Sequence, residues 1–108
     1  MLSSWDTMID TVGPRSGMWV GRPKYSLVRS FVEGFGAGRD DEVLAGFQRW
    51  MSAMPQHHAV NNYAWSYLVL REAFEHGNED ELTYPEDDEV AIAHLFARLR
   101  EFRSLGAS

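Results

Sequence analysis

The sequence predicts an all-α fold, a compact single domain of about five helices that spans residues 1–108. Apolar residues recur at intervals of three and four along most of the chain, which is the spacing of one face of an α-helix. No stretch shows a convincing alternation of apolar and polar residues, the pattern of a half-buried strand. A length of 108 residues with 44% hydrophobic residues is sufficient for one hydrophobic core.

The first helix is predicted over residues 3–12. Ser3, followed three residues later by Asp6, resembles an N-terminal capping box, and Gly13-Pro14 ends the helix. In the Gly- and Pro-rich loop that follows, the apolar segment Met18-Trp19-Val20 is expected to enter the core. The apolar face of the helix comprises Trp5, Met8, Ile9 and Val12.

The second helix is predicted over residues 24–37, followed by a closely spaced run of glycines. A glycine inside a helix costs about 1 kcal/mol relative to alanine, so each needs a structural reason. We expect Gly34 to pack closely against another helix and Gly38 to end this one in the left-handed conformation. The buried stripe comprises Leu27, Val28, Phe31, Val32 and Phe35.

The third helix begins at the N-cap residue Asp40, and Pro55 ends it. The fourth spans residues 62–76, capped by Asn61 or Asn62, and it is central because apolar residues cover most of its circumference. The third helix buries Val43, Leu44, Phe47, Trp50, Met51 and Met54, and we assign Trp19, Trp50 and Trp65 to the core.

The last helix follows an acidic loop over residues 78–84. Thr83 and Glu86 form a second possible capping box, and Pro85 suits the first helical turn. The inner face of this helix comprises Ile92, Leu95, Phe96, Leu99 and Phe102.

Negative charge is concentrated in one part of the chain. Residues 72–89 contain nine carboxylates and no Lys or Arg. Such a surface repels phosphate backbones, which argues against nucleic-acid binding, and attracts a basic protein partner. The alternative is a solvated face that keeps the protein in solution. The predicted partner contacts are Glu79, Asp80, Glu81, Glu86, Asp87 and Asp88.

No catalytic, metal or cofactor centre is recognisable. The chain has no cysteine, which excludes a thiolate nucleophile and a zinc finger. His57-His58 has no His or carboxylate three or four residues later, so an exposed polar turn is expected rather than a metal site. His76 suits the negative C-terminal end of a helix, and His94 is expected to be solvated. Consecutive acids at helix N-termini are interpreted as caps rather than as acid–base pairs.

A cytoplasmic location without membrane contact is expected. The first residues alternate charge with hydrophobicity, unlike the basic cluster and apolar run of an export signal. The longest aliphatic run, Leu68-Val69-Leu70, is far shorter than the roughly 18 residues that a membrane span needs.

Several motifs resemble those of a family of small bacterial proteins. These have an R-P-G-M-Y-[I/L]-G loop, an L-x-x-F-L-x-G-Y helix, an F-x-x-[W/F] helix and a later Trp. The corresponding segments here are residues 15–21, 28–35, 47–50 and Trp65, with Ser16, Trp19 and Phe35 replacing Pro, Tyr and Tyr. Some members occur beside polymorphic-toxin genes and are treated as immunity proteins. The resemblance implies this fold and a protein-binding role, and it supplies no catalytic residues.

Three functions remain open. The first is a non-catalytic binding module, an immunity-like protein that neutralises a basic toxin through its acidic surface. The second is a structural or regulatory homo-oligomer, such as a homodimer, which would expose an apolar patch around Met18, Trp19, Phe35 or Trp50. The third is a small enzyme that uses His57, His58 and nearby acids, which requires a pocket joining these histidines to a buried carboxylate.

Overall fold

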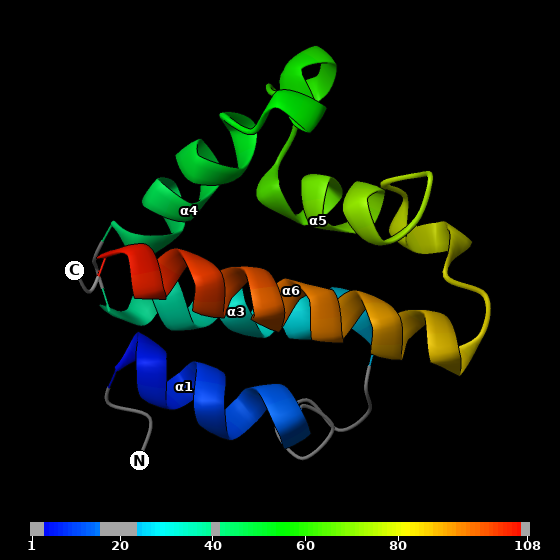
Figure 1. Ribbon diagram of the computed structural model, residues 1–108. Coiled ribbons are helices and arrows are strands. Elements are labelled where there is room, and N and C mark those ends of the chain that lie inside the picture. Colours follow the sequence, from blue (N-terminus) through cyan, green and yellow to red (C-terminus); the bar gives the residue numbers. More distant parts are fainter. Residues whose placement is uncertain (1–3, 16–23, 40–41, 107–108) are drawn as a thin grey trace.

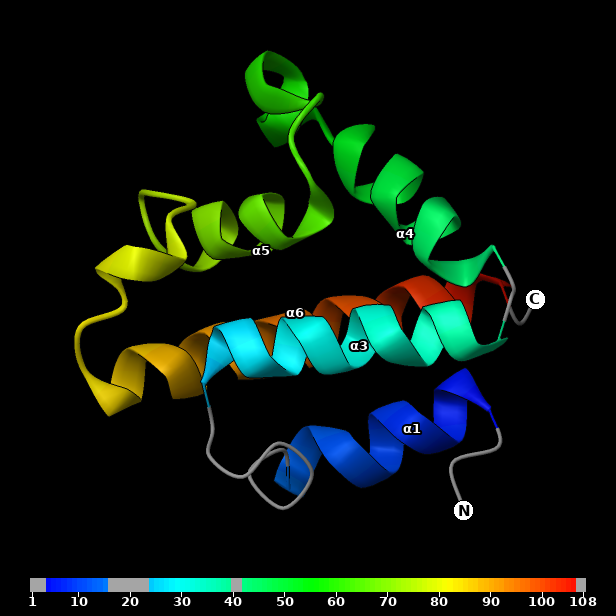
Figure 2. The ribbon, with the colours of Figure 1, turned by 180° about the vertical axis from the view of Figure 1, so that it is seen from behind.

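The longest helix, α6 (Pro85–Gly106), lies in the middle of the molecule and contacts helices on both sides. The computed structural model describes residues 4–15, 24–39 and 42–106. Helix α3 (Tyr25–Arg39) runs alongside α6, and the two form a central layer in both ribbon views (Figures 1 and 2).

The central pair is covered on two sides. Helix α1 (Trp5–Val12) lies on one side, and α4 (Val43–Ser52) and α5 (Trp65–Ala73) lie on the other, where they meet at an angle (Figure 1). The predicted all-α fold is confirmed, and the described part of the chain contains no strand.

Three short 3-10 helices complete the described structure. Helix η1 (Gly13–Arg15) continues α1, η2 (Pro55–Val60) forms the corner between α4 and α5, and η3 (Glu79–Glu81) precedes α6. A membrane-crossing helix, which must be both long and apolar, does not occur within these described segments.

The predicted apolar face of α1 is confirmed, because all four of its residues are buried. The N-cap is Ser4, whose side chain accepts a hydrogen bond from the Thr7 backbone N–H at 3.1 Å. The predicted cap Ser3 and the segment Met18-Trp19-Val20 lie outside the described residues.

An aromatic cluster fills the space between α4, α5 and α6. The Phe47 ring lies 5.7 Å from the rings of both Trp65 and Phe102, with edge-on geometry. Trp65 is buried and Trp50 is partly buried, as expected for core residues, and Trp19 lies outside the described residues. Edge-on aromatic pairs add to the stabilisation that burial provides.

The predictions for two glycines were wrong. A methyl group built on Gly34 meets no atom within 4 Å, so Gly34 makes no close helix contact. Gly38 lies inside α3, and its φ angle is not in the left-handed range. The close approach occurs at Gly36, where a Cβ atom would lie 2.9 Å from Leu44 Cδ1 and 3.3 Å from Trp5 Cζ2.

Two predicted helix starts were displaced. Helix α5 begins at Trp65 rather than near Asn62, because the Trp65 backbone N–H donates to the Gln48 side chain on α4. At α6, the predicted capping box of Thr83 and Glu86 is shifted by one residue. The Tyr84 backbone N–H donates to Asp87 Oδ2 at 3.3 Å instead. The predicted cap of α4, Asp40, lies outside the described residues.

Candidate functional site

The six acidic residues predicted to bind a partner differ in how the structure uses them. Glu79 is engaged by Arg29, which donates from Nε and, at 3.2 Å, from Nη2. Asp80 is exposed, and exposed Glu81 lies 3.6 Å from His76 Nε2. Glu79 is therefore partly neutralised, whereas the other two carboxylates face solvent.

The remaining three lie at the start of α6. Glu86 is exposed, and Asp87 caps the helix through Tyr84. Asp88 is only 2% exposed: its Oδ1 accepts the Tyr25 backbone N–H at 2.7 Å, and Lys24 Nζ lies 3.6 Å from Oδ2. Asp88 therefore has a structural role inside the fold, where it binds the N-terminus of α3.

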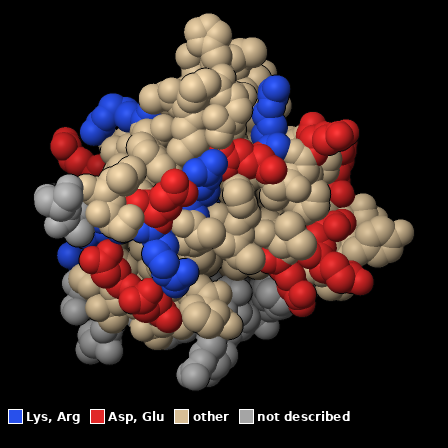
Figure 3. All heavy atoms as spheres, in the orientation of Figure 1, with Lys and Arg blue, Asp and Glu red and all other residues tan. Residues whose placement is uncertain are grey.

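The exposed carboxylates of this region form a surface that we call the acidic face. It comprises Asp80, Glu81, Glu86 and Glu89. Figure 3 shows acidic side chains gathering toward the right-hand end of the molecule, where η3 and the first turns of α6 lie.

Two exposed hydrophobic side chains accompany the acidic face. Tyr84 is 66% exposed, immediately before α6, and Val90 is 50% exposed. Glu86, Glu89 and Val90 share one face of α6, because residues three and four apart are neighbours on a helix. The face therefore combines carboxylates with apolar surface.

A second site was not predicted from the sequence. A cleft of about 560 Å³ lies between η2, α5 and α6, and we call it the α5–α6 cleft. It is lined by Gln56, His57, Arg71, Glu72, His94 and Arg98.

Glu72 is the centre of the polar contacts in this cleft. Its Oε1 accepts from His94 Nε2 at 2.7 Å and from Arg98 Nε at 2.8 Å. Its Oε2 accepts from His57 Nε2 at 2.7 Å, Arg98 Nη2 at 2.9 Å and Gln56 Nε2 at 3.1 Å. The carboxylate thereby joins η2 and α6 to α5.

These contacts determine the ionisation of Glu72. Burial on its own raises the pKa of the carboxyl, but hydrogen bonds from Arg98, His94 and His57 outweigh burial and lower the pKa to about 2. Because an ionised carboxylate only accepts hydrogen bonds, both histidines must carry a hydrogen on Nε2. Glu72 is consequently a fixed anion that orients two imidazole rings.

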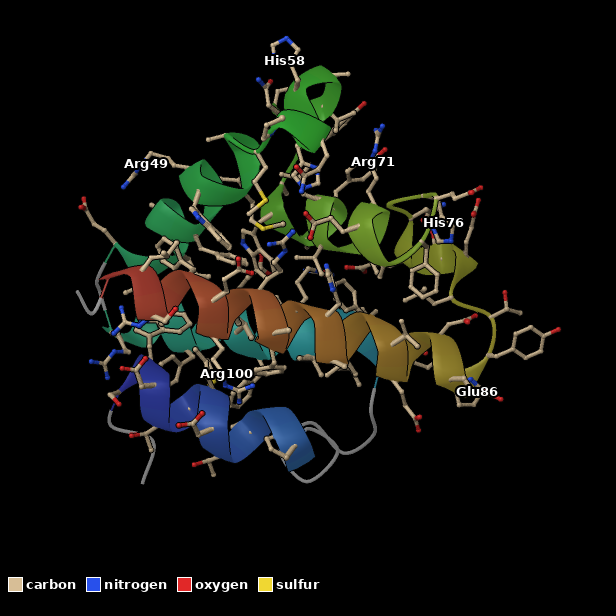
Figure 4. All side chains as sticks on the ribbon, viewed as in Figure 1. Arg49, His58, Arg71, His76, Glu86 and Arg100 are labelled. Atoms are coloured by element: carbon tan, nitrogen blue, oxygen red, sulfur yellow. The ribbon has the colours of Figure 1, made fainter. Side chains whose placement is uncertain are left out.

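The predictions for His57 and His94 were wrong. His57 is 1% exposed, because the chain turns at η2 and places its ring against Glu72. The His94 side chain is 30% exposed rather than fully solvated, because its Nε2 is bonded to the same carboxylate. His58 is exposed and extends outward from the corner at η2 (Figure 4).

The enzyme hypothesis required a pocket that joins both histidines to a buried carboxylate. His57 lies in such a pocket with Glu72, whereas His58 does not line it. His57 offers no accessible nitrogen, since Nε2 is bonded to Glu72 and Nδ1, which has no hydrogen-bond partner among the described residues, is buried. His94 differs, because it is partly exposed and no hydrogen bond to its Nδ1 occurs in the described part of the chain.

The two arginines of the cleft have different environments. Arg98 already has several partners. Besides binding Glu72, it donates to Glu101 Oε1 at 2.9 Å, and its guanidinium group lies 5.6 Å from the centre of the Trp50 ring. Arg71 is exposed on α5 and forms no ion pair within the described residues. Figure 4 shows Arg71 extending outward from α5.

One local signal for the cleft exists in the sequence. His94 and Arg98 are four residues apart, which places them on one face of the last helix. Nothing in the spacing shows that Glu72 lies opposite them.

Within the described segments, no group of three His, Cys, Asp or Glu side chains is arranged to hold a metal ion.

Comparison of the chain with protein-family models, with curated proteins and with solved structures gives no match. The acidic face and the α5–α6 cleft are therefore the two features of the molecule that bear on its function.

Proposed function

We propose that the protein is a non-catalytic binding module of the cytoplasm, which binds a basic protein partner through its acidic face. The observation that carries the proposal is Tyr84, a large and 66% exposed side chain placed among exposed carboxylates. Exposed aromatic residues provide anchors at protein interfaces, and charged rims accelerate the encounter.

The charges of the acidic face support this proposal. Asp80, Glu86 and Glu89 form no ion pair with any basic side chain of the described residues, so their charge is available to a partner. A basic domain that normally binds a negatively charged substrate fits this chemistry. The resemblance to immunity proteins supports a toxin encoded beside this protein as that partner, blocked by occlusion of its substrate site.

The homo-oligomer alternative has less support. Of the residues expected to expose an apolar patch, Phe35 and Trp50 are partly buried and pack against the core. Met18 and Trp19 lie outside the described residues. Sedimentation of the isolated protein over a range of concentrations distinguishes a stable dimer from a monomer.

Two charge-reversal variants test the acidic face. Glu86→Lys/Glu89→Lys changes the face itself, and the control Asp10→Lys/Glu42→Lys reverses two exposed acids on other elements. Both variants alter the net charge of the protein equally. The control also removes the exposed ion pair between Asp10 and Arg100, so urea unfolding of both variants verifies that their folds are intact. The purified protein is titrated against the product of the neighbouring gene at low and at physiological salt.

The first variant should lower the association rate at low salt by at least about tenfold, and the control should change it much less. Tyr84→Ala should mainly raise the dissociation rate, because it removes an anchor rather than a charge. Equal effects of the two charge variants mean that net charge alone matters and contradict a specific face. A stable dimer that does not bind the neighbouring product contradicts the binding-module proposal.

A further inference from the structure

We propose that the α5–α6 cleft binds a small molecule through one anionic group, a carboxylate or a phosphate, held by Arg71 and His94. The proposal is independent of the acidic face, because it uses other residues and a different kind of ligand. A cleft volume of about 560 Å³ lies within the roughly 300–1,000 Å³ that is typical of small-molecule sites.

Arg71 provides the cation of this site. Glu75 lies four residues later, beyond the end of α5 at Ala73, and the two form no ion pair in the described structure, where Arg71 has no other acidic partner either. A guanidinium group presents parallel N–H donors that match the oxygens of a carboxylate or a phosphate. Arg71 therefore offers unused, directional binding capacity at the edge of the cleft.

His94 provides the second contact. The bond between its Nε2 and Glu72 Oε1 at 2.7 Å fixes the ring, and Nδ1 on the other side of the ring remains available. Nδ1 accepts a hydrogen bond from a ligand hydroxyl when the ring is neutral, and it donates to an anionic oxygen when the ring is protonated. Because the ring is already oriented, binding requires little further ordering.

The neighbouring Glu72 does not prevent an anion from binding. Its charge is matched by Arg98 at 2.8 and 2.9 Å, and His57, His94 and Gln56 occupy its remaining acceptor positions. The protonated His94 ring that donates to an anionic oxygen adds a positive charge to the site, and without it the lining residues carry two positive charges and one negative charge. The surplus positive charge belongs to Arg71.

The test is an NMR titration of the isotope-labelled full chain with inorganic phosphate and, separately, with succinate. Sodium chloride keeps the ionic strength constant, so that general screening does not contribute. We expect saturable shifts of the His94 ring signals and of the Arg71 side chain. The anion that binds more tightly identifies the ligand group as phosphate or carboxylate.

Matched variants separate the site from surface charge in general. Arg71→Gln should weaken binding by at least about tenfold, as expected for losing a charge-assisted hydrogen bond. Arg49→Gln, which removes an arginine that extends outward from α4, should leave the affinity unchanged (Figure 4). Likewise, His94→Gln should weaken binding and His58→Gln should not.

The proposal is overturned if neither anion gives saturable shifts at His94, or if Arg49→Gln weakens binding as much as Arg71→Gln. Arg71 is exposed, so its replacement leaves the fold intact and the result interpretable even if His94→Gln disturbs Glu72. The variants Glu86→Lys/Glu89→Lys and Asp10→Lys/Glu42→Lys should bind the anion with equal affinity. This comparison separates the cleft from the acidic face.

Discussion

At the scale of single residues, Glu72 connects the most distant parts of the site. Its carboxylate accepts from Gln56 and His57 on η2 and from His94 and Arg98 on α6, while its own backbone belongs to α5. A side chain with this many partners is effectively fixed. Removing its charge leaves the partly buried Arg98 without its main counterion.

We therefore expect Glu72→Gln to lower the free energy of unfolding by about 2–4 kcal/mol. Urea unfolding at neutral pH measures this loss. Glu101→Gln is the control, because Glu101 contacts the same arginine from an exposed position and should change stability by less than about 0.5 kcal/mol. Equal effects of the two variants would show that Glu72 is no more than another surface partner of Arg98.

The lowered pKa of Glu72 predicts a pH dependence. The carboxyl has a pKa of about 2 in the fold against an ordinary value of 4.5, so the unfolded chain binds its proton more readily. Ionised Glu72 consequently stabilises the fold at pH values above 4.5, and this contribution is lost as the pH falls from 4.5 toward 2. The stability difference between wild type and Glu72→Gln should shrink over that range in urea titrations. A difference that stays constant contradicts the assignment.

At the scale of elements, Asp88 on α6 determines where α3 begins. It accepts the Tyr25 N–H at 2.7 Å and is 63 residues away in the sequence, so a tertiary contact replaces a local N-cap. Asp88→Ala should destabilise the protein by about 2 kcal/mol, because it leaves a buried N–H without an acceptor. Hydrogen exchange should show the loss first at Tyr25. Glu89→Ala, at the adjacent exposed position, should leave that exchange rate unchanged.

The glycines of α3 provide a second prediction. Gly34→Ala should stabilise the protein by about 0.5–1 kcal/mol, because the new methyl group meets no atom and alanine favours the helix. Gly36→Ala should lack this gain and lower the stability, because its methyl group would press on Leu44 and on the buried Trp5 ring. Thermal unfolding of both variants measures the contrast, and identical shifts in Tm would contradict it.

The elements could be predicted from the sequence where the signal is local. The spacing of Trp5, Met8, Ile9 and Val12 identified the buried face of α1. The predicted start of α5 was wrong because a contact between distant parts of the sequence determines it. The Trp65 backbone N–H donates to Gln48, which lies on another helix. The glycine run was misinterpreted for the same reason, because only the placement of Leu44 and Trp5 shows that Gly36 is the packed position.

The candidate sites, like the helices, could be predicted only where the sequence signal is local. The acidic composition of residues 79–89 is a local property, and the structure leaves four of these carboxylates exposed, namely Asp80, Glu81, Glu86 and Glu89. Which acids remain exposed depends on tertiary contacts, such as those that bury Asp88 against Tyr25. The α5–α6 cleft joins Glu72 to segments 15 and 26 residues away from it, so the local spacing of His94 and Arg98 is not enough to predict the cleft.

At the scale of the whole molecule, α6 provides the surface that α1, α3, α4 and α5 share. The buried residues of all five helices form one hydrophobic cluster, so we expect a single cooperative unfolding transition. Leu99→Ala, at a fully buried position of α6, should cost about 2–5 kcal/mol. Far-ultraviolet circular dichroism and tryptophan fluorescence should give the same midpoint for the variant. Separate midpoints would show that one layer unfolds independently of α6.

The position of α6 in the order of the elements has a consequence for synthesis on the ribosome. Helices α1 to α5 emerge first, and Phe47 then lacks Phe102, the α6 side chain that packs against its ring, since α6 begins only at Pro85. Ion pairs join α6 back to α1, from Arg100 to Asp10 at 3.3 Å and from Arg103 to Asp6 at 3.1 Å. The nascent chain therefore completes the packing of its earlier helices only when α6 is present. Its apolar faces stay accessible to chaperones until α6 has left the exit tunnel.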